Sequence, residues 1–105
     1  MNGMDEVKII EGAQGKLTVA LSGDIHAGNA EEFYNLVAEA YEANPANILF
    51  KGENLNFIDS TTLGVFVKIL KKAKADGHGV RLQGLQQKIK KLFLICSLDT
   101  IMEID

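Results

Sequence analysis

The chain has 105 residues, enough to bury one hydrophobic core and too few for two. Hydrophobic residues make up 47% of the sequence and charged residues 24%. This balance is typical of a folded protein and argues against a disordered chain. This length predicts a single domain over residues 1–105. Because the net charge is −3 and basic residues are scattered among acidic ones, we expect no nucleic-acid partner.

Two strands are predicted at the beginning of the chain. The stretch Val7–Ile10 is followed by Leu17–Leu21, in which leucine and valine recur at every second position. The glycines of Gly12–Gly15 suit a tight turn between the two segments. The sequence therefore predicts an antiparallel hairpin.

A helix is predicted next, because the apolar residues after Gly23 and Asp24 recur with a helical period. Asn29 and Glu32 have the spacing of a capping box at its start. Pro45 disfavours helical geometry in the residue before it, so the helix should end ahead of this proline. The side expected to face the core consists of Ala30, Phe33, Val37, Ala40 and Tyr41.

The middle of the chain predicts one more strand and a second helix. Ile48–Phe50 is a short apolar run typical of a buried central strand. The stretch Gly52–Ile58 is predicted as a loop, and Asp59 or Ser60 as the cap of the helix that follows. The apolar side of that helix consists of Leu63, Phe66, Val67, Leu70 and Ala73.

The last third of the chain completes the α/β pattern. Gly77 and Gly79 end the second helix, and a strand at Val80–Gln83, a helix at Gln86–Ser97 and an edge strand at Ile101–Ile104 follow. The order is ββαβαβαβ, which predicts an α/β fold with a largely parallel or mixed sheet. The residues of the third helix expected to face inward are Ile89, Leu92 and Phe93.

The sequence lacks the patterns of common catalytic and metal sites. His26 and His78 lie far apart in predicted loops, with no further ligand at metal spacing, so we interpret both as solvated. There is no Gly-x-Ser-x-Gly elbow and no phosphate-binding glycine loop. Cys96 stands beside apolar Leu94 and Ile95, which predicts a thiol in the core. We therefore expect no enzymatic activity, no metal and no cofactor.

The sequence also predicts the cellular compartment. No apolar run approaches the roughly 20 residues that a membrane span requires, and the N-terminus lacks the pattern of a secretory signal. A single cysteine fits a reducing environment. We expect a cytoplasmic protein without a membrane partner.

One segment, Asn56–Phe66, combines features that the rest of the chain lacks. It places three consecutive hydroxyls, Ser60, Thr61 and Thr62, directly after Asp59 in the first turn of the second helix. Hydroxyls at a helix start commonly accept hydrogen bonds from backbone N–H groups that have no partner within the helix. On chemistry alone, this cluster is interpreted as a helix cap.

The block Phe57–Phe66 resembles the signature of STAS domains, the family of bacterial anti-sigma factor antagonists. That signature reads roughly aromatic, apolar, Asp, Ser, Ser or Thr, Gly, Leu, Gly. Leu21–Ile25, Leu92-Phe93 and Leu98–Ile101 resemble further parts of the family pattern, so the resemblance covers nearly the whole chain. It implies a mixed β-sheet with helices packed mainly on one face, in agreement with the predicted order of elements.

The resemblance also implies a function. The phosphorylated serine of the family, directly after the Asp, falls on Ser60, with Thr61 as the alternative. An unphosphorylated protein of this kind binds an anti-sigma factor that is a serine kinase, and so releases a sigma factor; phosphorylation ends the complex and a serine phosphatase restores it. We expect a monomer or weak dimer. The partner-binding residues implied are Asp24, Ile25, His26, Asp59, Ser60, Thr61, Thr62 and Gly64.

The chain departs from the family pattern in three places. Thr62 occupies the usual position of a glycine, His26 that of an aspartate, and Lys51-Gly52 that of an acidic or amide residue followed by an apolar one. These departures favour an alternative function, a non-phosphorylated STAS scaffold or accessory subunit of a larger regulatory or transport assembly. A third alternative is a protein that binds a nucleotide and hydrolyses it slowly. The absence of a phosphate-binding glycine loop argues against it.

Overall fold

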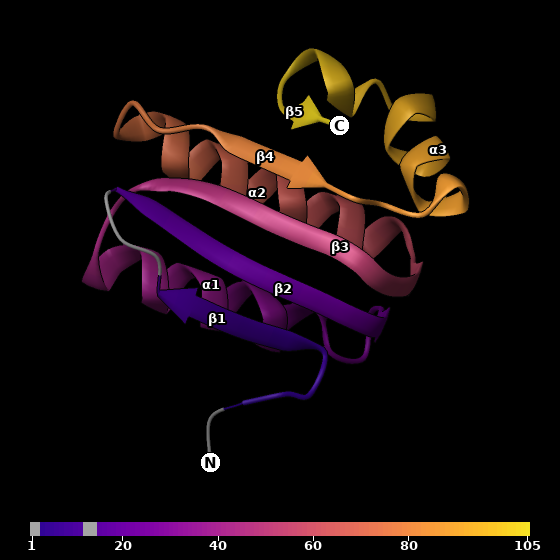
Figure 1. The fold of residues 1–105 in the computed structure, drawn as a ribbon, viewed down its shortest axis with the longest axis horizontal. Helices are drawn as coiled ribbons and strands as arrows, with labels where there is room; N and C mark the ends of the chain where they lie inside the picture. The colour runs from indigo at the N-terminus through magenta and orange to yellow at the C-terminus, as the bar shows by residue number, and fades with distance from the viewer. Residues whose placement is uncertain (1–2, 12–14) are drawn as a thin grey trace.

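A five-stranded sheet, in the order β1-β2-β3-β4-β5, forms the centre of the computed structural model (Figure 1). The structure describes residues 3–11 and 15–105. Strand β1 is antiparallel to β2, as the predicted hairpin requires, and β2 to β5 are parallel. The predicted turn at Gly12–Gly15 lies largely outside the described residues. The strands are β1 (Val7–Glu11), β2 (Lys16–Ile25), β3 (Asn47–Ile58), β4 (Val80–Gln83) and β5 (Glu103–Ile104).

The described residues also form three α-helices and one short 3₁₀ helix. These are α1 (Ala30–Ala43), α2 (Ser60–Ala75), α3 (Gln87–Ile95) and η1 (Leu98–Thr100). The order of strands and α-helices confirms the predicted ββαβαβαβ arrangement. Helix α2 begins at Ser60 with Asp59 as its N-cap, as the sequence predicts.

The helices cover one face of the sheet. Leu17, Val19 and Leu21 of β2 are buried, whereas the residues between them are half-buried. Figure 1 shows α1 and α2 side by side behind the strands, with α3 beyond the end of β4. The opposite face carries exposed polar side chains such as Lys51 and Arg81. The structure therefore confirms helices packed mainly on one face.

An aromatic cluster fills the core between the sheet and the helices. Phe66 of α2 stands at its centre, with ring centroids 5.2 Å from Phe33, 5.1 Å from Phe50 and 5.2 Å from Phe93. All four rings are fully buried and meet edge to face, a favourable geometry for aromatic pairs. Phe66 thus joins α1, α2, α3 and β3.

The predicted loop at Gly52–Ile58 is wrong, because these residues continue β3. Strand β3 pairs with β2 as far as Ile25 and Ile58, but the register shifts twice along the way. Each shift adds one residue to β3, as in a β-bulge, and changes the spacing of its buried positions from two residues to three. The alternation that identifies a strand in a sequence is lost at these bulges, which explains the wrong prediction.

The third helix is shorter and less buried than predicted. It ends at Ile95 instead of Ser97, and Leu92 is 36% exposed instead of facing the core. Cys96 is also exposed, so the prediction of a core thiol is wrong. Because α3 has only two buried residues, Ile89 and Phe93, most of its apolar side chains remain at the surface. The edge strand is correspondingly reduced to Glu103–Ile104.

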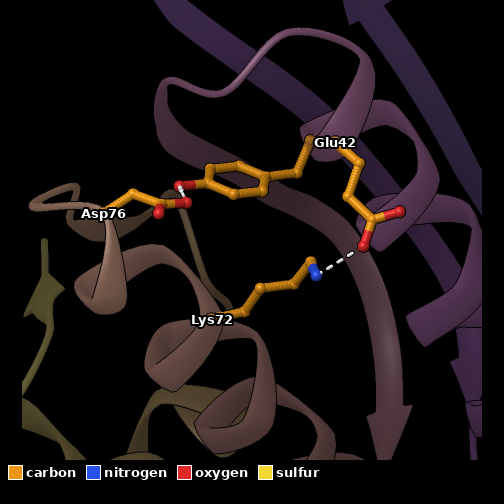
Figure 2. A network of polar contacts seen from close by, with 4 residues as sticks. Glu42, Lys72 and Asp76 are labelled. Atoms are coloured by element: carbon orange, nitrogen blue, oxygen red, sulfur yellow. Dashed lines mark hydrogen bonds and ion pairs between the residues drawn. The ribbon is translucent and has the colours of Figure 1, made fainter.

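Polar contacts brace α1 against α2 at the ends remote from Ser60 (Figure 2). Lys72 Nζ lies 2.6 Å from Glu42 Oε2. The hydroxyl of Tyr41 donates to Asp76 Oδ2 at 2.8 Å and lies 2.8 Å from His78 Nδ1, so His78 is not simply solvated. Burial, together with the hydrogen bond to Asp76 and its charge, raises the pKa of Tyr41 to about 12.

We expect Phe66→Ala to lower the free energy of unfolding by about 3–5 kcal/mol, because it removes the ring that three other phenylalanines contact. Phe57→Ala is the matched control, since Phe57 is 49% exposed and its loss should cost about 1 kcal/mol or less. Urea denaturation of both variants measures the difference. Equal losses would contradict the central position of Phe66.

Candidate functional site

The candidate site lies where β2 and β3 end side by side. Asp24 is paired in register with Phe57, and Ile25 with Ile58. From these points the chain enters the loop before α1 and the first turn of α2, at the right-hand ends of β2 and β3 in Figure 1. Because parallel strands end at the same edge of a sheet, two segments far apart in sequence meet here.

Asp59 holds the two segments together. Its Oδ1 accepts the N–H of Thr62 at 3.0 Å, which caps α2. Its Oδ2 accepts the N–H of Ala27, in the loop after β2, at 2.8 Å. One carboxylate therefore fixes the start of α2 and the position of the loop relative to it.

The loop after β2 also carries its own hydrogen bonds. The N–H of His26 donates to Asn29 Oδ1 at 2.8 Å, and Asn29 Nδ2 donates to the carbonyl of Asp24 at 3.1 Å. The N–H of Gly28 donates to His26 Nδ1 at 3.0 Å. Asn29 is the N-cap residue of α1, but its side chain bonds to the loop instead of the helix, so the predicted capping box with Glu32 is wrong.

The three hydroxyls that follow Asp59 have different surroundings. Ser60 and Thr61 are exposed, whereas Thr62 is fully buried. Oγ1 of Thr62 lies 2.6 Å from the carbonyl oxygen of Ile25 and 2.9 Å from Asp59 Oδ1. Two hydroxyls of the predicted cluster are thus available to a partner, and the third belongs to the interior.

Hydrogen bonding controls the charge of Asp59. The N–H of Thr62 and then that of Ala27, together with the Thr62 hydroxyl and the nearby His26, hold the pKa of the Asp59 carboxyl below its usual value, against a desolvation effect that acts the other way. The group is therefore ionised at neutral pH, as a helix cap and loop anchor require.

The structure brings all the predicted site residues to this end of the sheet. Asp24, His26, Ser60, Thr61 and Gly64 are exposed. Asp59 is half-buried, and the side chains of Ile25 and Thr62 are buried.

Two features of the site escaped the sequence analysis. Phe57 is 49% exposed beside Asp24, although an aromatic residue in an apolar block suggests burial. The hydroxyl of Thr62 bonds into the core. The signal for Thr62 was its spacing, because it lies four residues before Phe66 on the buried side of the helix.

The described part of the chain holds no group of three His, Cys, Asp or Glu residues that could bind a metal ion. Its helices are also too short or too polar to cross a membrane.

Comparisons with known proteins identify the family to which this chain belongs. The family model of the STAS domain matches residues 6–105. The anti-sigma-B factor antagonist of Bacillus subtilis (strain 168) is 32% identical to this chain over 89 residues, which make up 84% of this chain and 80% of the relative. The chain therefore belongs to the STAS domain family.

Solved structures support the fold. The anti-sigma factor antagonist SpoIIAA in its unphosphorylated form aligns with a TM-score of 0.76 at 15% identity, covering 94% of this chain and 86% of that one. The phosphorylated form of Bacillus SpoIIAA aligns with a TM-score of 0.72 at 18% identity, covering 94% and 90% of the two chains. At these identities the likeness concerns the fold alone.

We expect Asp59→Asn to lower the unfolding temperature at pH 7, because the amide replaces one of two accepting oxygens with a donor. A pKa that is lower in the folded state gives stability above the unfolded pKa, and this stability is lost as pH falls through the folded value. The difference in unfolding temperature between parent and variant should therefore shrink below about pH 4. Thermal unfolding at pH 7 and pH 3 measures it, with exposed Asp99→Asn as control. A gap of the same size at both pH values would contradict an ionised cap.

Proposed function

We propose that this chain is an anti-sigma factor antagonist, a protein-binding switch and not an enzyme, set by phosphorylation of Ser60. The observation that carries the proposal is the exposed side chain of Ser60 at the first position of α2, directly after the cap Asp59. The similarity to an anti-sigma-B factor antagonist and the family membership support it. Thr61, also exposed, is the alternative acceptor.

The start of α2 can accommodate a phosphate without a change of fold. A phosphoryl group adds about −1.5 to −2 charge and three acceptor oxygens, and the N–H groups and dipole of a helix start favour such an anion. The N–H of Thr62 is already bonded to Asp59, whereas the N–H groups of Ser60 and Thr61 stand before it at the helix terminus. Phosphorylation would therefore act on the surface and leave the aromatic core in place.

The exposed residues around Ser60 form the proposed partner-binding surface: Asp24, His26, Ser60, Thr61 and Gly64. In this proposal the partner is an anti-sigma factor with serine kinase activity, which binds the unphosphorylated surface and so frees a sigma factor. A dianion inside the complex would face desolvation and would repel any acidic group opposite it. A serine phosphatase would restore binding, and the chain would act in the cytoplasm as a monomer or weak dimer.

One observation favours a second candidate, a STAS scaffold that is never phosphorylated. His26 stands where the family usually has an aspartate, and its Nδ1 is occupied by the N–H of Gly28. A loop with an imidazole in place of a carboxylate presents a different surface to a kinase. Such a scaffold would bind its partner whatever the charge at position 60.

Replacing Ser60 separates the two candidates. In the switch, Ser60→Asp should weaken binding to the kinase anti-sigma factor of the same organism at least about tenfold, because it places a charge in the interface. Ser60→Ala removes the acceptor without adding charge and should change affinity little. Because Asp carries about one charge, its effect is a lower bound for phosphorylation.

Mass spectrometry after incubation with the same kinase and ATP identifies the acceptor. We expect phosphate on Ser60 in the parent and its loss in Ser60→Ala, unless Thr61 is the acceptor, in which case Thr61→Ala removes it. If no phosphate appears on either residue and Ser60→Asp binds as the parent does, the switch is wrong and the scaffold takes its place.

A further inference from the structure

Thr62 is the sole fully buried polar residue in the part of the chain that the structure describes. Its hydroxyl has one proton and lies within hydrogen-bonding distance of two acceptors, the carbonyl oxygen of Ile25 at 2.6 Å and Asp59 Oδ1 at 2.9 Å. Ile25 is the last residue of β2 and Asp59 caps α2. The hydroxyl therefore joins the first turn of the helix to the end of the neighbouring strand.

This link lies beside the hydrogen bond from Ala27 N–H to Asp59 Oδ2. Two contacts, one from Ile25 at the end of β2 and one from Ala27 in the loop after it, thus converge on the start of α2. The far end of the loop is tied back as well, because Asn29 Oδ1 accepts the N–H of His26 and Asn29 Nδ2 donates to the carbonyl of Asp24. Displacement of the helix start would strain the bonds to Ile25 and Ala27.

We propose that Thr62 is a positioning residue that holds the end of β2, with Asp24, and the loop after it, with His26, in a fixed relation to Ser60, so that the partner-binding surface is formed before the partner arrives. The inference rests on the proposed function, since it concerns the same surface. A preformed surface binds more tightly because less conformational entropy is lost on association. The burial of Thr62 also keeps its hydroxyl away from a kinase, so its role is not that of an acceptor.

A purely structural role for Thr62 makes different predictions. If its methyl group alone matters, as core packing, Thr62→Val should be harmless and Thr62→Ser should be disruptive. If the hydroxyl matters, the order is reversed. Valine keeps the shape of threonine and removes the hydrogen bond, whereas serine keeps the hydrogen bond and removes the methyl group.

The first test needs no partner and follows hydrogen exchange of the Ala27 amide. In Thr62→Val this amide should exchange about tenfold faster than in the parent, because the loop is released from one of its two anchors on α2. Thr62→Ser should exchange as the parent does. Tyr41→Phe is the matched control, since it also removes a 2.8 Å hydroxyl contact, but with Asp76 at the opposite end of α2. Unchanged exchange in Thr62→Val would overturn the inference.

The second test measures affinity for the same kinase anti-sigma factor used with the Ser60 variants, at a temperature where every variant is folded. Thr62→Val should bind at least about fivefold more weakly, and Thr62→Ser and Tyr41→Phe within about twofold of the parent. If the parent binds and Thr62→Val binds equally well, the inference fails. If the parent itself does not bind, the proposed function fails, whereas faster exchange in Thr62→Val would still support the positioning role.

Discussion

The carboxylate of Asp59 is the interaction on which the candidate site depends. It accepts N–H groups from its own helix and from a loop 32 residues earlier in the chain. Without it, the start of α2 would lose its cap and the loop after β2 would lose its contact with the helix at Ala27. Ser60 follows this carboxylate directly, so its position depends on an anion that is already in place.

Helix α2 is held along its whole length, which explains how a chemical change at its start can remain local. Its first turn is tied to the end of β2 through Thr62, its middle packs through Phe66 against three other rings, and its last turns meet α1 through Lys72 and Asp76. A charge added at Ser60 would stand beside two elements, the first turn of α2 and the loop after β2, that Asp59 and Thr62 hold together. In the proposed switch, phosphorylation would therefore alter the surface potential and leave the fold unaltered.

The sequence was sufficient for the order of elements and for the start of α2, because these depend on local patterns. Asp59 followed by hydroxyls and an apolar period defines a helix start wherever it occurs. The sequence was insufficient where tertiary pairing decides the outcome. The bulges of β3 depend on its alignment with β2, and the exposure of Cys96 depends on how little of α3 touches the sheet. The buried hydroxyl of Thr62 needs an acceptor that only the folded chain supplies.

The two bulges of β3 also bear on which face of the sheet its side chains occupy. Between the pairs Lys16–Asn47 and Ile25–Ile58, β3 uses two residues more than β2 to cover the same ladder. Each bulge takes up its extra residue without turning the strand over, because Leu55, which lies between the two bulges, is buried like Ile48 before them and Ile58 after them. Ile58 therefore points to the helices as Ile48 does, and Asp59 begins α2 within reach of Ala27. A change of one residue in length at either bulge can therefore be absorbed there, leaving the site on the same side of the sheet.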